Sequence, residues 1–351
     1  MKKTLAMLPI AVISTGRGLL NHRRTSILAG ACLLVTLVTG LGAVSRADEP
    51  NADQAPRYLG GHLFIPSTVV PDPFVSTTFM TTTGFGSAVN LVVPIYNLKG
   101  VKIAETSSDI GFMQLGFDYQ YAVKPRLALR VNGNGSARIG TTASSILAEG
   151  ISALYGYGFG TTVSMMRRSN WQLSATADLR GNTLYSISPL GFVRAVVRSA
   201  VAGDSAGALG AASDSLVDSG NNLRVLGGLR AAYTPAPWIG FTGFVETGMG
   251  EKFQSGTSNS SVTNVGATTS FDFNPLIKIP VGLLGVFRYE SLGEKGDDIG
   301  SAQNLGLGIF YTGRRFFSVG LENTWSQIAQ SRTSEKIDVA QGRFVIRYDF
   351  N

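Results

Sequence analysis

The chain has 351 residues, of which 44% are hydrophobic and only 15% charged, with 43 glycines and a mean hydropathy of +0.15. A charge content this low and a glycine content this high are unusual for a soluble enzyme and fit an all-β protein with crowded walls. The formal net charge of +7 is a property of the whole chain, and the N-terminus contributes most of it.

The first 47 residues are predicted to be an export signal. Basic residues come before an apolar run over residues 27–44, and the small residues Ser45 and Ala47 suit cleavage near Ala47. An uncleaved membrane helix is the alternative. The true start codon is left open, because a second apolar run precedes the first at residues 5–13.

Removing this leader changes what the charge implies. The leader holds six of the 30 Lys and Arg residues and none of the 23 acids, which leaves 24 bases against 23 acids. A mature chain with a net charge near +1 gives no electrostatic reason to expect nucleic acid as a partner. The single cysteine, Cys32, also lies in the leader, so the mature chain uses neither disulfides nor thiol chemistry.

Residues 48–73 are rich in Pro and Asp and are predicted to form an irregular periplasmic segment. The β-structured part of the chain is predicted to follow as one domain over residues 74–351. Its first strand, at 74–83, is weakly patterned, and residues 88–96 compete for the same role.

Period-two alternation then recurs along the chain. In the clearest case, residues 113, 115, 117, 119 and 121 are apolar or aromatic, while those between them include Gln114, Gly116 and Asp118. This alternation is the signature of a strand with two unlike faces. Further strands with the same pattern are predicted near 127–138, 155–165, 171–180, 223–233, 239–249, 265–273, 281–290, 304–311, 317–326 and 343–350.

The count is therefore about twelve strands, and their connections alternate in length. Short turns fall near Val123, Ser169, Thr234, Asn274 and Gly313, with long loops between them. Such alternation is what an up-and-down meander produces when its two rims face different compartments.

The residues on the two faces of the predicted strands favour a barrel in a membrane over a soluble one. The polar face carries mostly Gly, Ser, Thr, Asn, Asp and Arg, whereas the apolar face carries almost no charge over a strand length. A charge on a lipid-facing strand costs roughly 2–4 kcal/mol at the bilayer midplane, so this absence is informative. Closure into a barrel is then required, because an open edge in lipid leaves backbone groups unpaired.

Aromatic residues cluster where the strands meet the short turns, as in a membrane-interface girdle. They are Tyr119, Tyr121, Trp171, Tyr233, Trp238, Tyr311, Tyr348 and Phe350.

With these features, residues 74–351 resemble the Gram-negative outer-membrane β-barrels, a broad superfamily that includes porins and transporters. The resemblance rests on pattern and on a final strand ending Arg347-Tyr348-Asp349-Phe350-Asn351. It implies a closed antiparallel transmembrane barrel in the bacterial outer membrane, with outer-membrane lipids and the barrel-assembly machinery as partners. In that superfamily the last residue is usually aromatic, so the signal is displaced here by one place.

The polar face would line the interior and carries charges of both signs. The candidate selectivity residues are Arg130, Arg138, Arg180, Arg224, Arg230, Arg288, Arg343 and Arg347, with Asp118, Asp178, Glu246, Asp272, Glu290, Glu322 and Asp349. Two arrangements are open. The charges segregate into a basic and an acidic wall, or they pair across strands and fill the barrel.

A long insertion at residues 186–221 is predicted to contain a helix in one outer loop. Ser188-Pro189 makes a plausible N-terminal cap, and an apolar stripe follows. The helix either packs over the rim or folds into the lumen, where Arg194 and Arg198 would form a constriction.

Catalysis finds little support. His62 is the only histidine of the mature chain and lies in the Pro-rich segment, so no Ser–His pair within the barrel and no zinc cluster is expected. No enzymatic activity, metal or cofactor is predicted.

Three functions remain. The first is an outer-membrane channel for diffusion of small polar or charged solutes through a mixed-charge lumen. The others are a non-conducting structural or adhesive barrel, and uptake of apolar molecules, which the inward positions of Leu226, Leu284, Val286 and Phe310 would support.

Overall fold

The computed structural model describes seven ranges of the chain. They are residues 57–96, 102–140, 151–187, 217–251, 259–292, 301–329 and 336–350. The leader, and with it the predicted cleavage near Ala47, lies outside these ranges.

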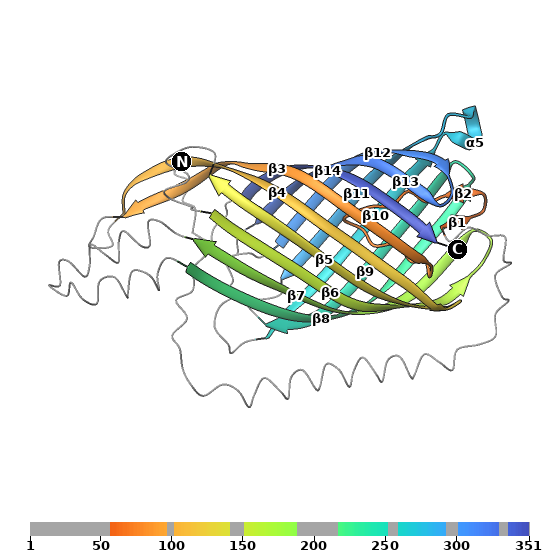
Figure 1. Ribbon diagram of the computed structural model, residues 1–351, viewed down its shortest axis with the longest axis horizontal. Coiled ribbons are helices and arrows are strands. Elements are labelled where there is room, and N and C mark those ends of the chain that lie inside the picture. The colour runs from red at the N-terminus through yellow and green to blue at the C-terminus, as the bar shows by residue number, and fades with distance from the viewer. Residues whose placement is uncertain are drawn as a thin grey trace.

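Twelve antiparallel strands close into a single barrel (Figure 1). Each strand pairs with its neighbours in the sequence, and β14 pairs back onto β3 from Val339↔Ala88 to Phe350↔Thr77. The up-and-down topology and the strand number predicted from the sequence are confirmed. The strands are β3 (Thr77–Tyr96), β4 (Lys102–Lys124), β5 (Leu127–Gly140), β6 (Ile151–Arg167), β7 (Trp171–Ile187), β8 (Val217–Ala236), β9 (Ile239–Glu251), β10 (Asn259–Asp272), β11 (Val281–Leu292), β12 (Ser301–Arg314), β13 (Phe317–Ala329) and β14 (Lys336–Phe350).

The barrel wall has its apolar side chains outside and its polar ones inside. On β12, Leu305, Leu307 and Ile309 are exposed, whereas Gly306 and Gly308 between them are buried. The other strands alternate in the same sense, and the exposed residues form an almost continuous coat of Leu, Val, Ile, Phe and Tyr. A soluble barrel has the opposite arrangement, because its apolar side chains must be removed from water.

The start of the barrel differs from the prediction. The two competing candidates at 74–83 and 88–96 belong to one strand, β3, which begins at Thr77. Phe74 is not part of it: its side chain is fully buried against Phe64. The sequence was ambiguous here because threonines and glycines, which alternate weakly in hydropathy, occupy much of the strand.

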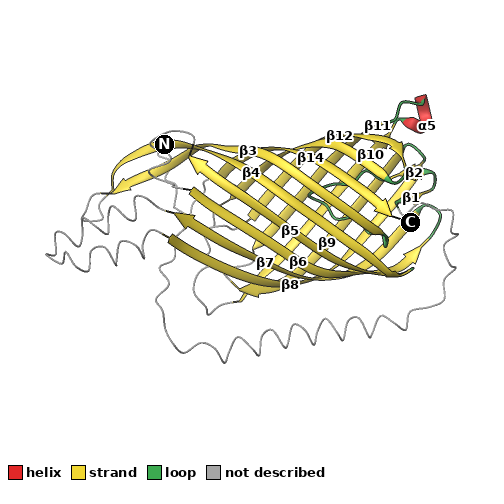
Figure 2. Cartoon of the chain, in the orientation of Figure 1, coloured by secondary structure: helices red, strands yellow, loops and turns green. Residues whose placement is uncertain are grey.

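The short turns lie at one end of the barrel, together with the C-terminal end of β14 (Figure 1). The connection from β10 to β11 at this end contains α5 (Asn274–Ile277), the only helix among the described residues (Figure 2). The helical insertion predicted at residues 186–221 lies mostly outside the described ranges, and Arg194 and Arg198 lie there with it. Its two ends differ from the prediction, because residues 186–187 belong to β7 and residues 217–221 belong to β8. None of the helices in the described part of the chain is long and apolar enough to cross a membrane.

Residues 57–76, which we call the lumen segment, lie inside the barrel at the short-turn end. The segment starts with a small hairpin of β1 (Tyr58–Leu59) and β2 (His62–Leu63), joined by Gly60 and Gly61 at φ of 54° and 87°. Such left-handed backbone suits glycine. The sequence predicted an irregular periplasmic segment here. The irregularity is present, but the structure places the segment within the lumen, where it packs on the wall (Figure 2).

Apolar side chains of the lumen segment cover an apolar patch of the inner wall. Ile65, Val69 and Val70 pack with inward residues of β9, β11, β12 and β14, namely Phe244, Leu284, Val286, Phe310 and Val345. Burying each of these side chains contributes roughly 1.5–3 kcal/mol. The patch is a small hydrophobic core inside a polar lumen, and it explains why a segment with so little regular structure has a defined position.

Candidate functional site in the lumen

A five-residue charge network crosses the interior between β5 and β9. Asp178 accepts hydrogen bonds from Arg130 at 2.9 Å, Arg180 at 2.8 Å and Arg230 at 3.1 Å. Glu246 accepts from Arg180 at 2.9 Å and from Arg230 at 3.0 Å. Both acids and Arg230 are almost completely removed from solvent, so each charge depends on its partners.

Glycine on β6 makes room for this network. A Cβ atom added to Gly160 would overlap Asp178 Oδ1, so only hydrogen fits there. Gly156 and Gly158 on the same strand likewise leave space for the amide side chains of Asn134, Asn182 and Asn132 on the neighbouring strands.

A second cluster lies farther from the short turns. Glu290 on β11 accepts from Arg224 at 3.4 Å and from Arg288 at 2.9 Å. Arg224 stands opposite Arg180 in the register of β7 and β8, which links the two clusters. Of the two arrangements left open by the sequence, the described side chains adopt the paired one, because complementary charges across strands stabilise each other in a poorly solvated interior.

Ion pairs and hydrogen bonds anchor the lumen segment to β13 and β14. Arg57 Nε donates to Asp349 at 2.8 Å, and Arg347, which also donates to Asp349 at 3.1 Å, pairs with Asp72. Glu322 accepts from the Thr68 amide at 2.9 Å and from its hydroxyl at 2.8 Å. Arg343 donates to the same hydroxyl at 2.8 Å. Four of the predicted lumen residues thus hold the chain's own N-terminal segment.

Side-chain amides on β4 and β7 bind backbone carbonyls of the same segment. Gln172 donates to the Pro73 carbonyl at 2.7 Å, and Gln120 donates to the carbonyls of Phe74 at 2.8 Å and Ser76 at 3.0 Å. The sequence reasoning missed these two glutamines, together with Arg57, Thr68 and Asp72. The available signal was their position, since Gln120 and Gln172 stand on the polar face close to short turns.

His62 is a buried lumen residue, which corrects two expectations. It is not a loop residue in the periplasm, and it does contact a barrel serine: Nε2 lies 2.8 Å from Ser270 Oγ, and Nδ1 lies 3.2 Å from the Pro237 carbonyl oxygen. Burial lowers the pKa of His62 to about 4, and its backbone contact with Pro237 opposes that shift. His62 and Ser270 are both buried, and the Nδ1 atom of His62 faces a backbone carbonyl rather than a carboxylate, so the pair fastens the segment to β10.

The remaining predicted lumen residues also sit at inward positions. Arg138 donates to Ser152 at 3.0 Å, and Asp118 lies on the inward face of β4. Asp272 accepts from the Thr312 hydroxyl at 2.8 Å and from the Asn274 amide at 3.0 Å, which closes the turn that carries α5. Within the ranges described, no group of three or more potential metal ligands comes together.

The predicted interface aromatics stand on the outer wall near the short turns. Tyr119, Tyr121, Tyr233, Trp238, Tyr311, Tyr348 and Phe350 are exposed, and Trp171 is half-buried. Trp238 stacks on Phe271, with 6.3 Å between ring centroids. Their role at a membrane interface remains a prediction.

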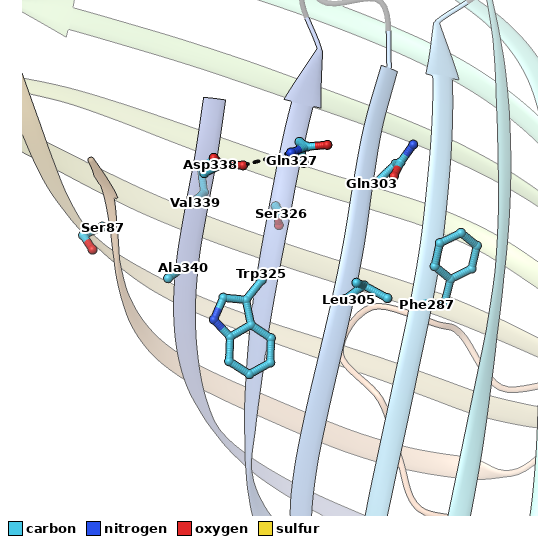
Figure 3. Close-up of a pocket in the computed structure, with 10 residues that line it drawn as sticks. All are labelled: Ser87, Phe287, Gln303, Leu305, Trp325, Ser326, Gln327, Asp338, Val339 and Ala340. Carbon is cyan, nitrogen blue, oxygen red and sulfur yellow. Dashed lines mark hydrogen bonds between the residues drawn. The ribbon is translucent and has the colours of Figure 1, made fainter. Parts of the chain in front are cut away.

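The outer wall also carries a shallow groove across β11–β14 and β3, with a volume of about 390 Å³ (Figure 3). Trp325, Leu305 and Phe287 form its apolar side, and Gln327 donates to Asp338 at 3.2 Å along its rim. These side chains point outward, so the groove is separate from the lumen.

No protein-family model and no curated protein matches the chain. Among solved structures, the translocator domain of the autotransporter NalP from Neisseria meningitidis has a TM-score of 0.43 and 10% identity, covering 94% of this chain and 98% of that one. The NanC porin has a TM-score of 0.44 and 7% identity, covering 78% and 100%. The toluene transporter TodX of Pseudomonas putida has a TM-score of 0.35 and 9% identity, covering 78% and 89%.

These neighbours are an autotransporter translocator domain, a porin and a toluene transporter. No family is assigned to the chain from them. The TM-scores are below 0.5, so nothing about the function of this chain is transferred from them.

Proposed function

We propose that the chain is a bacterial outer-membrane channel for small polar or charged solutes, closed at its short-turn end by the lumen segment. The proposal includes export with cleavage near Ala47, insertion by the barrel-assembly machinery, and a periplasmic location of the short turns. The observation that carries it is the inverted wall, with apolar residues outside and a polar, water-compatible lining inside.

Strand length supports a membrane location. The barrel strands have 12 to 23 residues, whereas a tilted strand needs about 9–11 residues to cross the hydrocarbon core. The barrel is therefore tall enough to span a bilayer and to extend beyond it. No enzymatic activity is part of the proposal.

The way in which the lumen segment is held supports a gate. Its backbone is not paired to a barrel strand in a ladder; it is held by side-chain contacts such as Glu322–Thr68 and Gln172–Pro73 and by the apolar patch. Contacts of this kind break without disturbing the strand ladders around them. The segment can then leave while the barrel stays closed on itself.

A reversible crosslink tests the gate. The mature chain has no cysteine, and a Cβ atom added to Gly61 would lie 3.2 Å from Pro237 Cβ, close to the roughly 3.5–4.5 Å spacing of a disulfide. We expect wild type to show brief, intermittent conductance steps in planar bilayers, because the segment closes the lumen most of the time and leaves it occasionally. Oxidised Gly61→Cys/Pro237→Cys should be closed, and reduction should restore the steps. The reduced double variant is the matched control, because it carries the same strain at Gly61.

Deleting residues 48–75 provides the opposite test. Closed channels should become open, with larger and longer steps than in wild type. Silence of the wild type, the reduced double variant and the deletion variant would contradict the channel and favour the non-conducting structural barrel.

Uptake of apolar molecules is the second candidate, and the apolar patch favours it. Leu284, Val286 and Phe310 face inward as that reading requires, but Ile65, Val69 and Val70 cover them. A silent barrel whose deletion variant binds a hydrophobic fluorescent probe, with binding lost on Phe310→Gln, would support this candidate over the first.

A further inference from the structure

The linked charge clusters above the lumen segment contain more bases than acids. Five arginines, Arg130, Arg180, Arg224, Arg230 and Arg288, share three acids, Asp178, Glu246 and Glu290. Adding Asp118, the acid on the inward face of β4 next to Arg130, still leaves one positive charge in excess. Each of the three acids therefore accepts hydrogen bonds from more than one arginine, and the clusters hold more arginine donors than the acids can pair with.

The acidic and basic side chains of these clusters also differ in how far they are exposed to solvent. The side chains of Asp178 and Glu246 are 3% and 1% exposed, whereas those of Arg180, Arg224 and Arg288 are 25%, 19% and 24% exposed. Glu290 is the one acid of these clusters that reaches the same surface. A solute that enters from the end remote from the short turns thus meets mainly guanidinium groups.

Donors in this layer are also left without acceptors. The Nε atoms of both Arg224 and Arg288 are buried and have no hydrogen-bond partner, although a guanidinium carries five N–H donors. Burying a donor without a partner costs free energy. A planar oxyanion that accepts from two guanidinium forks at once would supply the missing acceptors.

We propose that Arg224 and Arg288, together with Arg180, form a binding site for a small solute bearing a carboxylate or phosphate group. The inference rests on the proposed channel function and specifies its solute: an anion enters the clusters and shares the arginines with Glu290. Arg224 and Arg288 are the specificity-determining residues, and the buried network beneath them holds Arg180 in place.

Ion selectivity gives the first test. In a tenfold gradient of KCl, open channels of wild type or of the 48–75 deletion variant should show a reversal potential of the anion-selective sign. Arg224→Gln/Arg288→Gln should bring it close to zero. The control Lys278→Gln/Arg314→Gln removes the same charge at exposed positions outside the lumen and should leave it unchanged. Conductance without anion selectivity, or selectivity that survives Arg224→Gln/Arg288→Gln, would overturn the inference while the channel function stands.

Calorimetry gives the second test and needs no conduction. Citrate and inorganic phosphate are titrated separately into the folded full-length mature barrel, with sorbitol as the uncharged comparison. Each arginine removed should weaken anion binding about tenfold, the effect of losing one charge-assisted contact. Arg224→Lys/Arg288→Lys, which retains charge without the fork, should keep the selectivity and weaken the binding. Absence of anion binding, or equal binding to wild type and Arg224→Gln/Arg288→Gln, would overturn the site even in a conducting protein.

Discussion

At the scale of single residues, His62 links the lumen segment to pH. Its pKa is lowered to about 4 from a usual value near 6.5, so the buried form is neutral. Between these values the released segment binds a proton that the docked segment does not. The docked state is therefore fully stable above about pH 6.5 and loses up to roughly 3 kcal/mol as the pH falls toward 4.

We accordingly predict that acid opens the channel. The open probability in bilayers should rise from pH 7.5 to pH 4.5 in wild type. His62→Gln, which keeps a side chain able to hydrogen-bond but does not titrate in this range, should respond little to pH. A pH response of equal size in His62→Gln would mean that carboxylates of the barrel wall, and not His62, cause the opening.

At the scale of elements, the lumen segment depends on a few side chains rather than on strand pairing. One of them is Arg57, whose fully buried guanidinium binds Asp349 and Ser318 of the barrel and also the Phe64 carbonyl of the segment itself. Removing one member of a buried ion pair typically costs about 3–5 kcal/mol. The cost here should lie at the low end of that range, since Arg347 continues to donate to Asp349.

Arg57→Ala should therefore release the segment and leave the barrel intact. Hydrogen exchange followed by mass spectrometry should show faster exchange in residues 57–76, with the strands β4–β13 unchanged. Arg314→Ala, at an exposed short-turn position, is the control and should behave as wild type. Unchanged protection of residues 57–76 in Arg57→Ala would mean that the apolar patch alone holds the segment.

At the scale of the whole molecule, the orientation of the wall decides where the barrel resides. Leu307, which is 62% exposed on β12, should contact acyl chains, and Leu307→Arg should cost roughly 2–4 kcal/mol in a bilayer. Leu276 is similarly exposed, at 54%, but lies on α5 beyond the wall, so Leu276→Arg should cost little. Urea titration of the barrel folded into lipid vesicles measures both values. Equal and small costs would place the outer wall in water.

Much of the wall could be predicted from the sequence, and less of the site. Period-two alternation assigns each side chain to one face, so Asp178, Arg230 and Glu246 were identified as inward residues without a structure. Their partners could not be identified. Arg180 bonds to Glu246, which is 66 positions along the chain and two strands along the wall. Alternation shows that both side chains face inward, but it does not show which inward acid a given arginine reaches.

The sequence by itself determined that the chain is an up-and-down barrel of twelve strands with an apolar exterior, because these properties follow from local alternation and turn spacing. Only the tertiary structure decided what fills the interior. Residues 57–76 have no periodicity of their own, and their place in the lumen depends on apolar and charged partners from several strands, which only the folded barrel arranges around the segment. Local patterns carry no information about packing between segments far apart in the chain, so the position of the lumen segment and of the histidine within it became visible only in three dimensions.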